Sequence, residues 1–133
     1  MSKAIGRLAV DSNAVIAYRE GVAEVCRRIE DADLFFMPIV VLGELLYGAK
    51  NSERAAENEQ AVRTFFEYCV PVNTDEAVAT RYASLRRDLK SLGRPIPEND
   101  IWIAAACLEV DAALLSSDGH FCGITSLTVI DWL

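Results

Sequence analysis

The chain has 133 residues, of which 52% are hydrophobic and 25% are charged, a composition typical of a folded globular domain and not of a disordered segment. We expect one domain over residues 1–133, because this length suits a single core. The net charge of −7 argues against non-specific binding of nucleic acid, because phosphate binding depends on Lys and Arg. We find no signal peptide, and the longest apolar stretches fall short of the ~20 residues of a membrane helix, so we expect a cytoplasmic protein without membrane contact.

The chain contains four cysteines and a single histidine, His120. The cysteines are widely spaced and form no CxxC pair; they are Cys26, Cys69, Cys107 and Cys122. A zinc site needs several Cys or His ligands at short spacing, and that set is missing here. We therefore expect reduced and mostly buried thiols.

Short extended apolar runs alternate with helical apolar spacing along the whole chain. In the first half, the sequence predicts a strand at 7–10, a helix that starts at Ser12 or Asn13 and ends at Gly21, a helix from about Val22 to Ile29, a strand at 34–38, and a helix at 39–49. In the second half, it predicts a helix at 52–68, a strand at 69–72, a long helix capped by Asp75 and ended by Gly93, a loop at 94–97, a helix opened by Asp100, and strands at 112–116 and 127–131.

This alternation predicts an α/β fold with a mainly parallel central sheet. Ligands bind such sheets beyond the carboxyl ends of the strands. Asp11 and Asp118 each follow a predicted strand, which places both at that edge.

Glu44 is the most informative single acid. On the predicted helix at 39–49 its neighbours three and four positions away are apolar or small, so its carboxylate projects from an apolar surface. A buried carboxylate is costly unless it is paired or bound to a metal. Two explanations stay open from this position alone: a metal site, or an ion pair with a core arginine such as Arg81.

Each of the other three acids also has a purely structural explanation. Asp100 is a natural N-cap for the helix that follows it, and Asp11 and Asp118 are unremarkable as turn residues after strands. Together with Glu44, however, they gain weight, because a doubly wound sheet can bring all four carboxylates to one crevice. Two carboxylates ~4 Å apart repel by ~4 kcal/mol at an effective dielectric constant near 20. Such a cluster needs raised pKa values or a hard cation, Mg²⁺ or Mn²⁺, and such ions support phosphodiester hydrolysis.

The sequence lacks the motifs of competing active sites. It has no GxSxG, no P-loop and no GxGxxG, and Asn13 stands where a phosphoaspartate enzyme of the DxDx(T/V) type would need an acid.

Four segments carry a family resemblance: LAVDSNAVIAY, VLGELLYGAKNS, IPENDIWIAAACLE and LLSSDGHFCGITSLTVI. In this order and spacing they resemble the PIN-domain nucleases, and among them the VapC-like toxins of type II toxin–antitoxin pairs. The resemblance covers essentially the whole chain. It implies a three-layer α/β/α PIN-like fold and a metal-dependent endoribonuclease that hydrolyses RNA, such as tRNA or rRNA, by activated water.

The resemblance also implies roles for individual residues. The acids that match Asp11, Glu44, Asp100 and Asp118 are catalytic and bind Mg²⁺ or Mn²⁺. Ser116 supports the site, as do Asn13 and Asn99 beside the first and third acids. His120 stands where some relatives carry a further acid, and we expect it to face solvent or RNA and not to bind metal. Glu98 is interpreted as charge matched to a helix N-terminus.

A basic group accompanies these acids on the long predicted helix and near it. Arg86, Arg87, Lys90 and Arg94, with Lys50 elsewhere, are candidate contacts to RNA phosphates, although a solvated basic face explains them equally. The resemblance further implies a homodimer and an antitoxin whose tail places a basic side chain among the acids. Segments 22–29 and 39–47 are candidates for the antitoxin groove, or they are ordinary core.

Two other functions remain open from the sequence. One is a catalytically weak PIN-like module that acts through RNA or protein binding. The other is a metal-dependent phosphatase or DNA nuclease on the same sheet.

Overall fold

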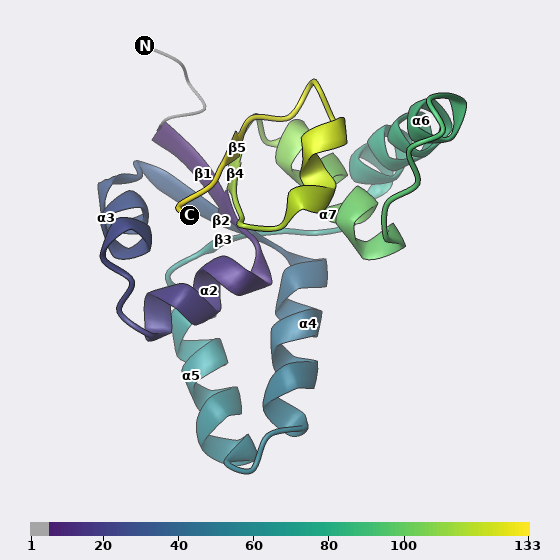
Figure 1. The fold of residues 1–133 in the computed structure, drawn as a ribbon. Helices are drawn as coiled ribbons and strands as arrows, with labels where there is room; N and C mark the ends of the chain where they lie inside the picture. The colour runs from purple at the N-terminus through teal and green to yellow at the C-terminus, as the bar shows by residue number, and fades with distance from the viewer. Residues whose placement is uncertain (1–5) are drawn as a thin grey trace.

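The computed structural model describes residues 6–133, which form one parallel sheet covered by helices (Figure 1). The strands are β1 (Arg7–Val10), β2 (Leu34–Pro38), β3 (Val70–Val72), β4 (Ala113–Leu115) and β5 (Val129–Ile130). They lie in the order β3-β2-β1-β4-β5, and every neighbouring pair is parallel. The predicted α/β fold with a parallel central sheet is confirmed.

Six helices connect the strands: α2 (Ser12–Arg19), α3 (Ala23–Asp31), α4 (Ile39–Lys50), α5 (Ala55–Glu67), α6 (Glu76–Ser91) and α7 (Glu98–Glu109). A 3₁₀ turn, η1 (Gly119–Gly123), joins β4 to β5. Crossovers between parallel strands are right-handed, so the path β1 to β2 to β3 puts α2 to α5 on one face of the sheet. The return from β3 to β4 puts α6 and α7 on the other face, and the three layers are visible in Figure 1.

Three helix starts differ from the sequence prediction. Helix α5 starts at Ala55 and not at Ser52, because the backbone N–H groups of Asn51 and Ser52 still donate to the Tyr47 and Ala49 carbonyls at the end of α4, at 3.1 Å each. Asp11, and not Ser12 or Asn13, caps α2, because its Oδ1 accepts a hydrogen bond of 2.8 Å from the Ser12 backbone N–H. Helix α7 starts before Asp100, because the extended backbone of Pro97 already presents its carbonyl to the Asp100 N–H at 3.0 Å. The prediction of Asp100 as an N-cap is therefore wrong, and its carboxylate lies in the first turn instead.

The boundaries of α6 follow the sequence prediction. Asp75 caps this helix, with its Oδ1 3.0 Å from the Val78 N–H. Gly93 follows the helix at a φ of +65°, a conformation that L side chains rarely adopt, and so ends it.

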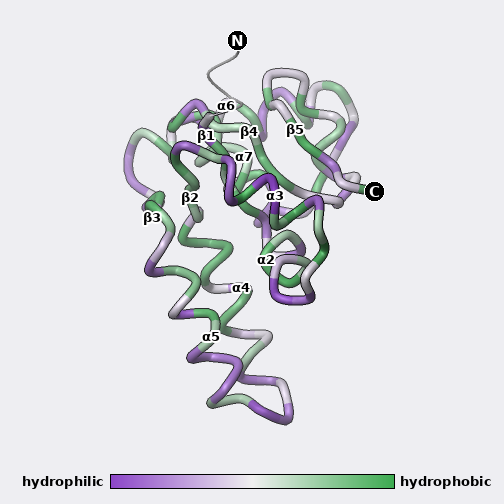
Figure 2. The backbone as a smooth tube through the Cα atoms, turned by 90° about the vertical axis from the view of Figure 1, so that its left-hand side faces the viewer, coloured by the Kyte–Doolittle hydropathy of each residue, from purple (hydrophilic) through white to green (hydrophobic). Residues whose placement is uncertain are grey.

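The apolar residues of β1, β4 and α7 belong to the hydrophobic core, whereas the tip of the α4–α5 hairpin is largely hydrophilic (Figure 2). Helix α7 is buried on most sides, because it packs against both the sheet and α6.

All four cysteines are free thiols, as predicted, and burial raises the pKa of Cys69 to about 12. Cys122, however, is exposed. Within residues 6–133 no helix has the length and apolarity of a membrane span.

Candidate active site

Strands β1 and β4 are neighbours, so the residues that follow them leave the sheet side by side. Val10 pairs with Leu115, and the Asp11 backbone N–H donates to the Leu115 carbonyl at 3.2 Å. Asp11 and Ser116 directly follow these two partners and are only 4% and 1% exposed. The same edge carries Asp118 two residues further on. The parallel register thus brings together residues that are more than a hundred positions apart in the sequence.

The hydroxyl of Ser116 connects both strand ends. It donates to Asp11 Oδ2 at 2.7 Å and accepts the Asp118 backbone N–H at 3.1 Å. The amide of Asn13 approaches the same oxygen at 3.5 Å, the outer limit of a hydrogen bond. Ser116 therefore holds one acid directly and the backbone of another.

Glu44 comes to the same place from the middle of α4. Its Oε2 accepts a long hydrogen bond of 3.4 Å from Asn99 Nδ2, at the start of α7. Its Oε1 is enclosed and accepts no hydrogen bond from the described residues. Burying a carboxylate oxygen without a hydrogen-bond partner costs free energy, so this atom is a candidate ligand of a cation.

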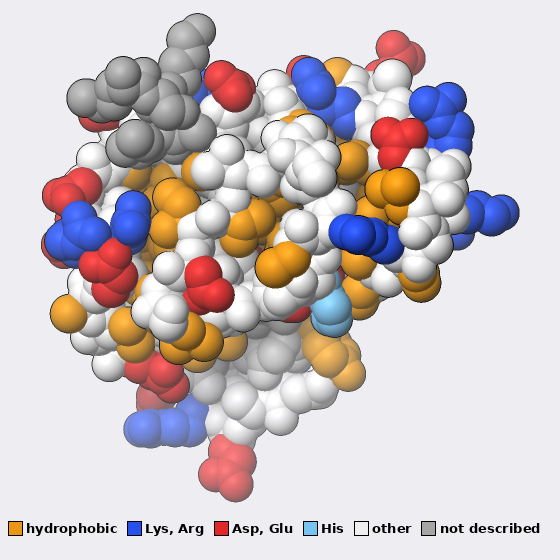
Figure 3. Space-filling view, turned by 45° about the horizontal axis from the view of Figure 1, so that its top comes forward, with side chains coloured by type: hydrophobic (Ala, Val, Ile, Leu, Met, Phe, Trp, Pro, Cys, Tyr) orange, Lys and Arg blue, Asp and Glu red, His pale blue; other side chains and the backbone are white. Residues whose placement is uncertain are grey.

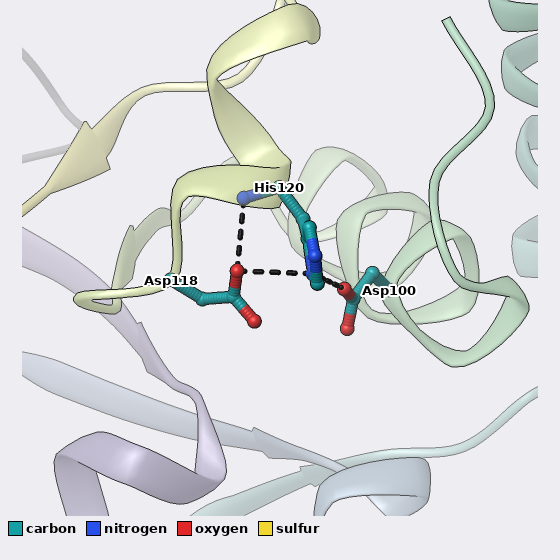
Figure 4. Close-up of side chains that lie close together, drawn as sticks. All are labelled: Asp100, Asp118 and His120. Atoms are coloured by element: carbon teal, nitrogen blue, oxygen red, sulfur yellow. Dashed lines mark hydrogen bonds and ion pairs between the residues drawn. The ribbon is translucent and has the colours of Figure 1, made fainter.

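Asp100 and Asp118 face each other across the ring of His120 (Figure 4). His120 Nδ1 lies 2.9 Å from Asp100 Oδ2 and 3.0 Å from Asp118 Oδ1. The His120 backbone N–H also donates to Asp118 Oδ1, at 2.9 Å. These three side chains form a group whose ligand atoms all lie within 4.8 Å of one another, close enough to hold a metal ion.

Three of the four acids have raised pKa values. For Asp11, burial is the largest cause, opposed by the Ser116 hydroxyl and reinforced by the charge of Asp118. For Asp100, burial again dominates, opposed by His120 and reinforced by Asp118 and Asp11. For Glu44, burial dominates, opposed by the Asn99 amide and reinforced by Asp11 and Asp100. The acids thus repel one another at one buried edge, and a cation would relieve this repulsion.

The structural explanation of Glu44 as the partner of Arg81 is wrong. Arg81 forms an exposed ion pair of 2.8 Å with Glu109 instead, at the far end of α7. Glu98 lies on the first turn of α7 and pairs with Arg86 at 2.8 Å, outside the acid cluster, as its interpretation as helix-terminal charge requires.

Two of the basic candidates are already paired with acids. Lys50 lies 3.0 Å from Glu59 near the tip of the α4–α5 hairpin, and Arg86 is held by Glu98. Their positive charge is partly neutralised, which weakens both as phosphate contacts.

The other basic candidates are less constrained. Arg87 makes only a long contact of 3.6 Å with Asp88, both side chains being exposed, and Lys90 is exposed. Arg94 packs against Gly123 at the end of η1, the turn that carries His120. In Figure 3 the histidine reaches the surface close to a basic side chain. Arg94 thus lies beside the turn that carries His120.

A groove of ≈ 580 Å³ opens beside Glu44, between α2, α4 and α5. Its walls combine polar and apolar side chains, including Ser12, Ile16, Arg19, Tyr47 and Asn99. Of the four acids, Glu44 lines this groove.

Sequence reasoning missed the position of His120. The ring is half exposed, so part of it does face solvent as predicted, but Nδ1 is directed at two carboxylates. The spacing signals only the backbone contact, because an aspartate in a turn accepts the N–H of the residue two positions on, as Asp118 does from His120. The contact of the ring with Asp100 depends on the tertiary structure.

The family profile of the PIN domain matches residues 8–126. The chain belongs to the PIN-domain family. Within that family its relatives are named ribonucleases of the VapC type, so the resemblance seen in the sequence is confirmed.

Three relatives show how far the similarity extends. Ribonuclease VapC1 of Haemophilus influenzae (strain R2866) is 28% identical over 92% of this chain and 96% of its own length. Ribonuclease VapC4 of Mycobacterium tuberculosis (strain ATCC 25618 / H37Rv) is 32% identical over 69% of this chain and 72% of its own. The structure of VapBC-1 from nontypeable Haemophilus influenzae has a TM-score of 0.85 at 27% identity, covering 95% of this chain and 98% of that one.

Proposed function

We propose that this protein is a divalent-metal-dependent endoribonuclease and the toxin of a type II toxin–antitoxin pair. The observation that carries the proposal is the enclosed Oε1 of Glu44, which accepts no hydrogen bond from residues 6–133 and lies at an edge shared with Asp11, Asp100 and Asp118. The names of the VapC relatives support ribonuclease activity, and the VapBC structure supports an antitoxin partner.

The donor set fits a hard divalent cation. Four carboxylates supply anionic oxygens, the ligands that Mg²⁺ and Mn²⁺ prefer, and three of these acids have pKa values raised by burial and mutual repulsion. Asp11, Glu44, Asp100 and Asp118 would hold the ion. When bound, it would supply Lewis acidity toward the scissile phosphate and the attacking water.

The surrounding residues keep these acids in position. Ser116 orients the Asp11 carboxylate and the loop of Asp118 through one hydroxyl, and Asn99 restrains Glu44 from α7. No side chain in this arrangement has to act as the nucleophile, because water serves that role.

RNA is the proposed substrate, and tRNA or rRNA the proposed target. Lys50, Arg86, Arg87, Lys90 and Arg94 are the proposed phosphate contacts, with the greatest weight on Arg94 and Lys90. A local basic surface beside the acids is compatible with the net charge of −7, because only the field near the substrate steers it.

The proposed antitoxin site is an apolar groove of ≈ 880 Å³ between α3, β2 and α5. Its apolar walls include Ile29, Leu34, Phe35, Phe65, Tyr68 and Val70, and three of them, Leu34, Tyr68 and Val70, remain exposed. Among residues 6–133, three acids, Glu30, Asp33 and Glu57, also line it, against one basic residue, Arg19. These features suit an amphipathic partner with a basic side. Of the candidate segments, 22–29 reaches this groove only through Ile29, whereas 39–47 lines the smaller groove beside Glu44.

The family resemblance also implies a homodimer, which light scattering of the purified chain tests directly. The alternative function, a weak PIN-like module that acts only by binding, predicts RNA association without cleavage.

Activity of the purified protein on tRNA, rRNA fragments and single-stranded DNA, with Mn²⁺ or with EDTA, tests the proposed function. We expect metal-dependent RNA cleavage that Asp11→Asn abolishes and that Asp31→Asn, a matched change at an exposed acid on α3, preserves. Cleavage that survives Asp11→Asn contradicts the proposal, as does preferential cleavage of DNA. RNA binding without cleavage supports the alternative.

A further inference from the structure

The imidazole of His120 lies between two of the four proposed metal-binding acids (Figure 4). We infer that His120 Nδ1 is a nitrogen ligand of the same cation site, beside Asp100 and Asp118, and that it makes the site prefer Mn²⁺ over Mg²⁺. This inference rests on the proposed function, because it concerns the cation of that site, but it assigns a ligand and a selectivity that the four acids alone do not supply.

The distances between the three side chains match a coordination sphere. A cation with ligand bonds of about 2.1 Å places neighbouring ligand atoms about 3 Å apart and opposite ones about 4.2 Å apart. His120 Nδ1 lies 2.9 Å from Asp100 Oδ2 and 3.0 Å from Asp118 Oδ1. All three ligand atoms fall within 4.8 Å of one another. The nitrogen therefore takes the place of a ligand adjacent to both oxygens.

A hydrogen bond alone explains these contacts less well. Nδ1 carries at most one hydrogen, which can point well at only one acceptor, yet both carboxylate oxygens lie at almost the same distance from it. A shared cation satisfies all three atoms at once.

The backbone holds the ring at this position. The His120 N–H donates to Asp118 Oδ1 at 2.9 Å, and the next residue, Phe121, is fully buried in the core. Since η1 is anchored on both sides of the ring, His120 is tied to Asp118 by the fold and not by the side chain alone. The ring is 52% exposed, which leaves the site open to solvent and substrate.

The type of ligand decides the selectivity. Mg²⁺ prefers an all-oxygen shell, whereas imidazole favours the transition metals, so one nitrogen shifts the balance toward Mn²⁺. His120 is the only histidine in the chain, so this ligand has no substitute elsewhere.

The single histidine makes the experiment unambiguous. Untagged protein is loaded with Mn²⁺ and measured by pulsed EPR, once with natural nitrogen and once with ¹⁵N-histidine. We expect a ¹⁴N coupling to Mn²⁺ that becomes a ¹⁵N coupling in the labelled protein and disappears in His120→Ala. By calorimetry, we expect His120→Ala to weaken Mn²⁺ binding by about tenfold or more and Mg²⁺ binding by much less. His120→Asp, which restores an all-oxygen set, should lower the ratio of Mn²⁺ to Mg²⁺ affinity.

The outcomes separate this inference from the proposed function. Bound Mn²⁺ without nitrogen coupling overturns the role of His120, even if RNA is cleaved and Asp11→Asn abolishes binding, in which case the proposed function stands. An unchanged Mn²⁺ to Mg²⁺ ratio in His120→Ala overturns the selectivity. Failure of the wild-type protein to bind Mn²⁺ at all overturns both proposals. The wild-type EPR measurement needs no variant, so a poorly folded variant does not obscure the result.

Discussion

The hydroxyl of Ser116 lies 2.7 Å from Asp11 Oδ2 and joins the ends of two strands that are 105 residues apart in the chain. The same oxygen accepts the Asp118 backbone N–H. One small side chain therefore sets the relative position of two of the four acids. Ser116 is buried, with only 1% of its surface exposed.

Ser116→Ala removes this connection. We expect the rate of RNA cleavage to fall about 10- to 100-fold, as is typical when a partner of a metal ligand is lost. The free energy of unfolding should fall by about 1 to 3 kcal/mol, because two buried hydrogen bonds are lost, one of them to a carboxylate. Single-turnover kinetics and urea denaturation measure the two effects. Ser116→Thr should retain activity, and Ser126→Ala, at an exposed serine, provides the control. Equal activity of Ser116→Ala and wild type contradicts this role.

Asp11→Asn should stabilise the metal-free protein at neutral pH. Because the folded-state pKa of Asp11 is raised, the folded protein binds this proton more tightly than the unfolded chain does. The contribution of Asp11 to the free energy of unfolding therefore grows as the pH falls from above the raised pKa toward 3.8, and it is least favourable at pH 7. Asparagine does not titrate, so the variant lacks this pH-dependent contribution to the free energy of unfolding. Urea denaturation in EDTA at pH 5 to 8 measures this effect. We expect Asp11→Asn to be more stable than wild type at pH 7, and its free energy of unfolding to increase less than that of wild type as the pH falls. A variant that is less stable at pH 7 refutes the expectation.

Mn²⁺ should raise the melting temperature of the wild-type protein, and Glu44→Gln should remove most of this increase. An ion at 100 times its Kd stabilises the folded state by about 2.7 kcal/mol. Since Glu44 Oε1 accepts no hydrogen bond from the described residues, a neutral amide at this position should not destabilise the metal-free protein. Thermal unfolding with and without Mn²⁺ checks both points. A full metal-induced shift in Glu44→Gln excludes Glu44 as a ligand.

Charge reversal should separate the basic candidates. Arg94→Glu and Lys90→Glu should raise KM for RNA and reduce the slope of log affinity against log salt by about 1 each. Lys50→Glu should have a smaller effect, because Lys50 already pairs with Glu59. Cleavage assays from 50 to 200 mM salt make the comparison. If none of the three substitutions alters the slope of log affinity against log salt, these residues do not contact phosphate.

The apolar groove should be the antitoxin site. Tyr68→Ala and Val70→Asp change exposed positions in the groove, so we expect weaker antitoxin binding with little loss of stability. Leu92→Ala changes an equally exposed apolar residue that does not line the groove and serves as the control. Co-purification and calorimetry with a candidate antitoxin measure the effect. Equal loss of affinity in Leu92→Ala would place the partner elsewhere.

Local signals were sufficient for most of the fold. Apolar periodicity and helix-ending residues such as Gly93 located every strand and α-helix of residues 6–133, because these depend on neighbours within a few positions. They did not locate the 3₁₀ turn η1, which carries His120. The errors lie at helix starts. Asp11 and Pro97 are the N-caps of α2 and α7. The position of an N-cap depends on which carbonyl or carboxylate the folded backbone presents to the first N–H groups of the helix.

The sequence by itself determined that four acids had to be accounted for, and that Glu44 projects from an apolar helix where a bare carboxylate is costly. Only the tertiary structure decided how these acids are held. The parallel register of β1 and β4 brings Ser116 to Asp11, α7 brings Asn99 to Glu44, and η1 turns His120 toward Asp100 and Asp118. The contacts of Ser116 with Asp11, Asn99 with Glu44 and His120 with Asp100 join residues that are 20 to 105 positions apart. Only the contact of His120 with Asp118 is local in the sequence. No local pattern encodes such distances, because they are set by how strands pair and how helices pack across the sheet.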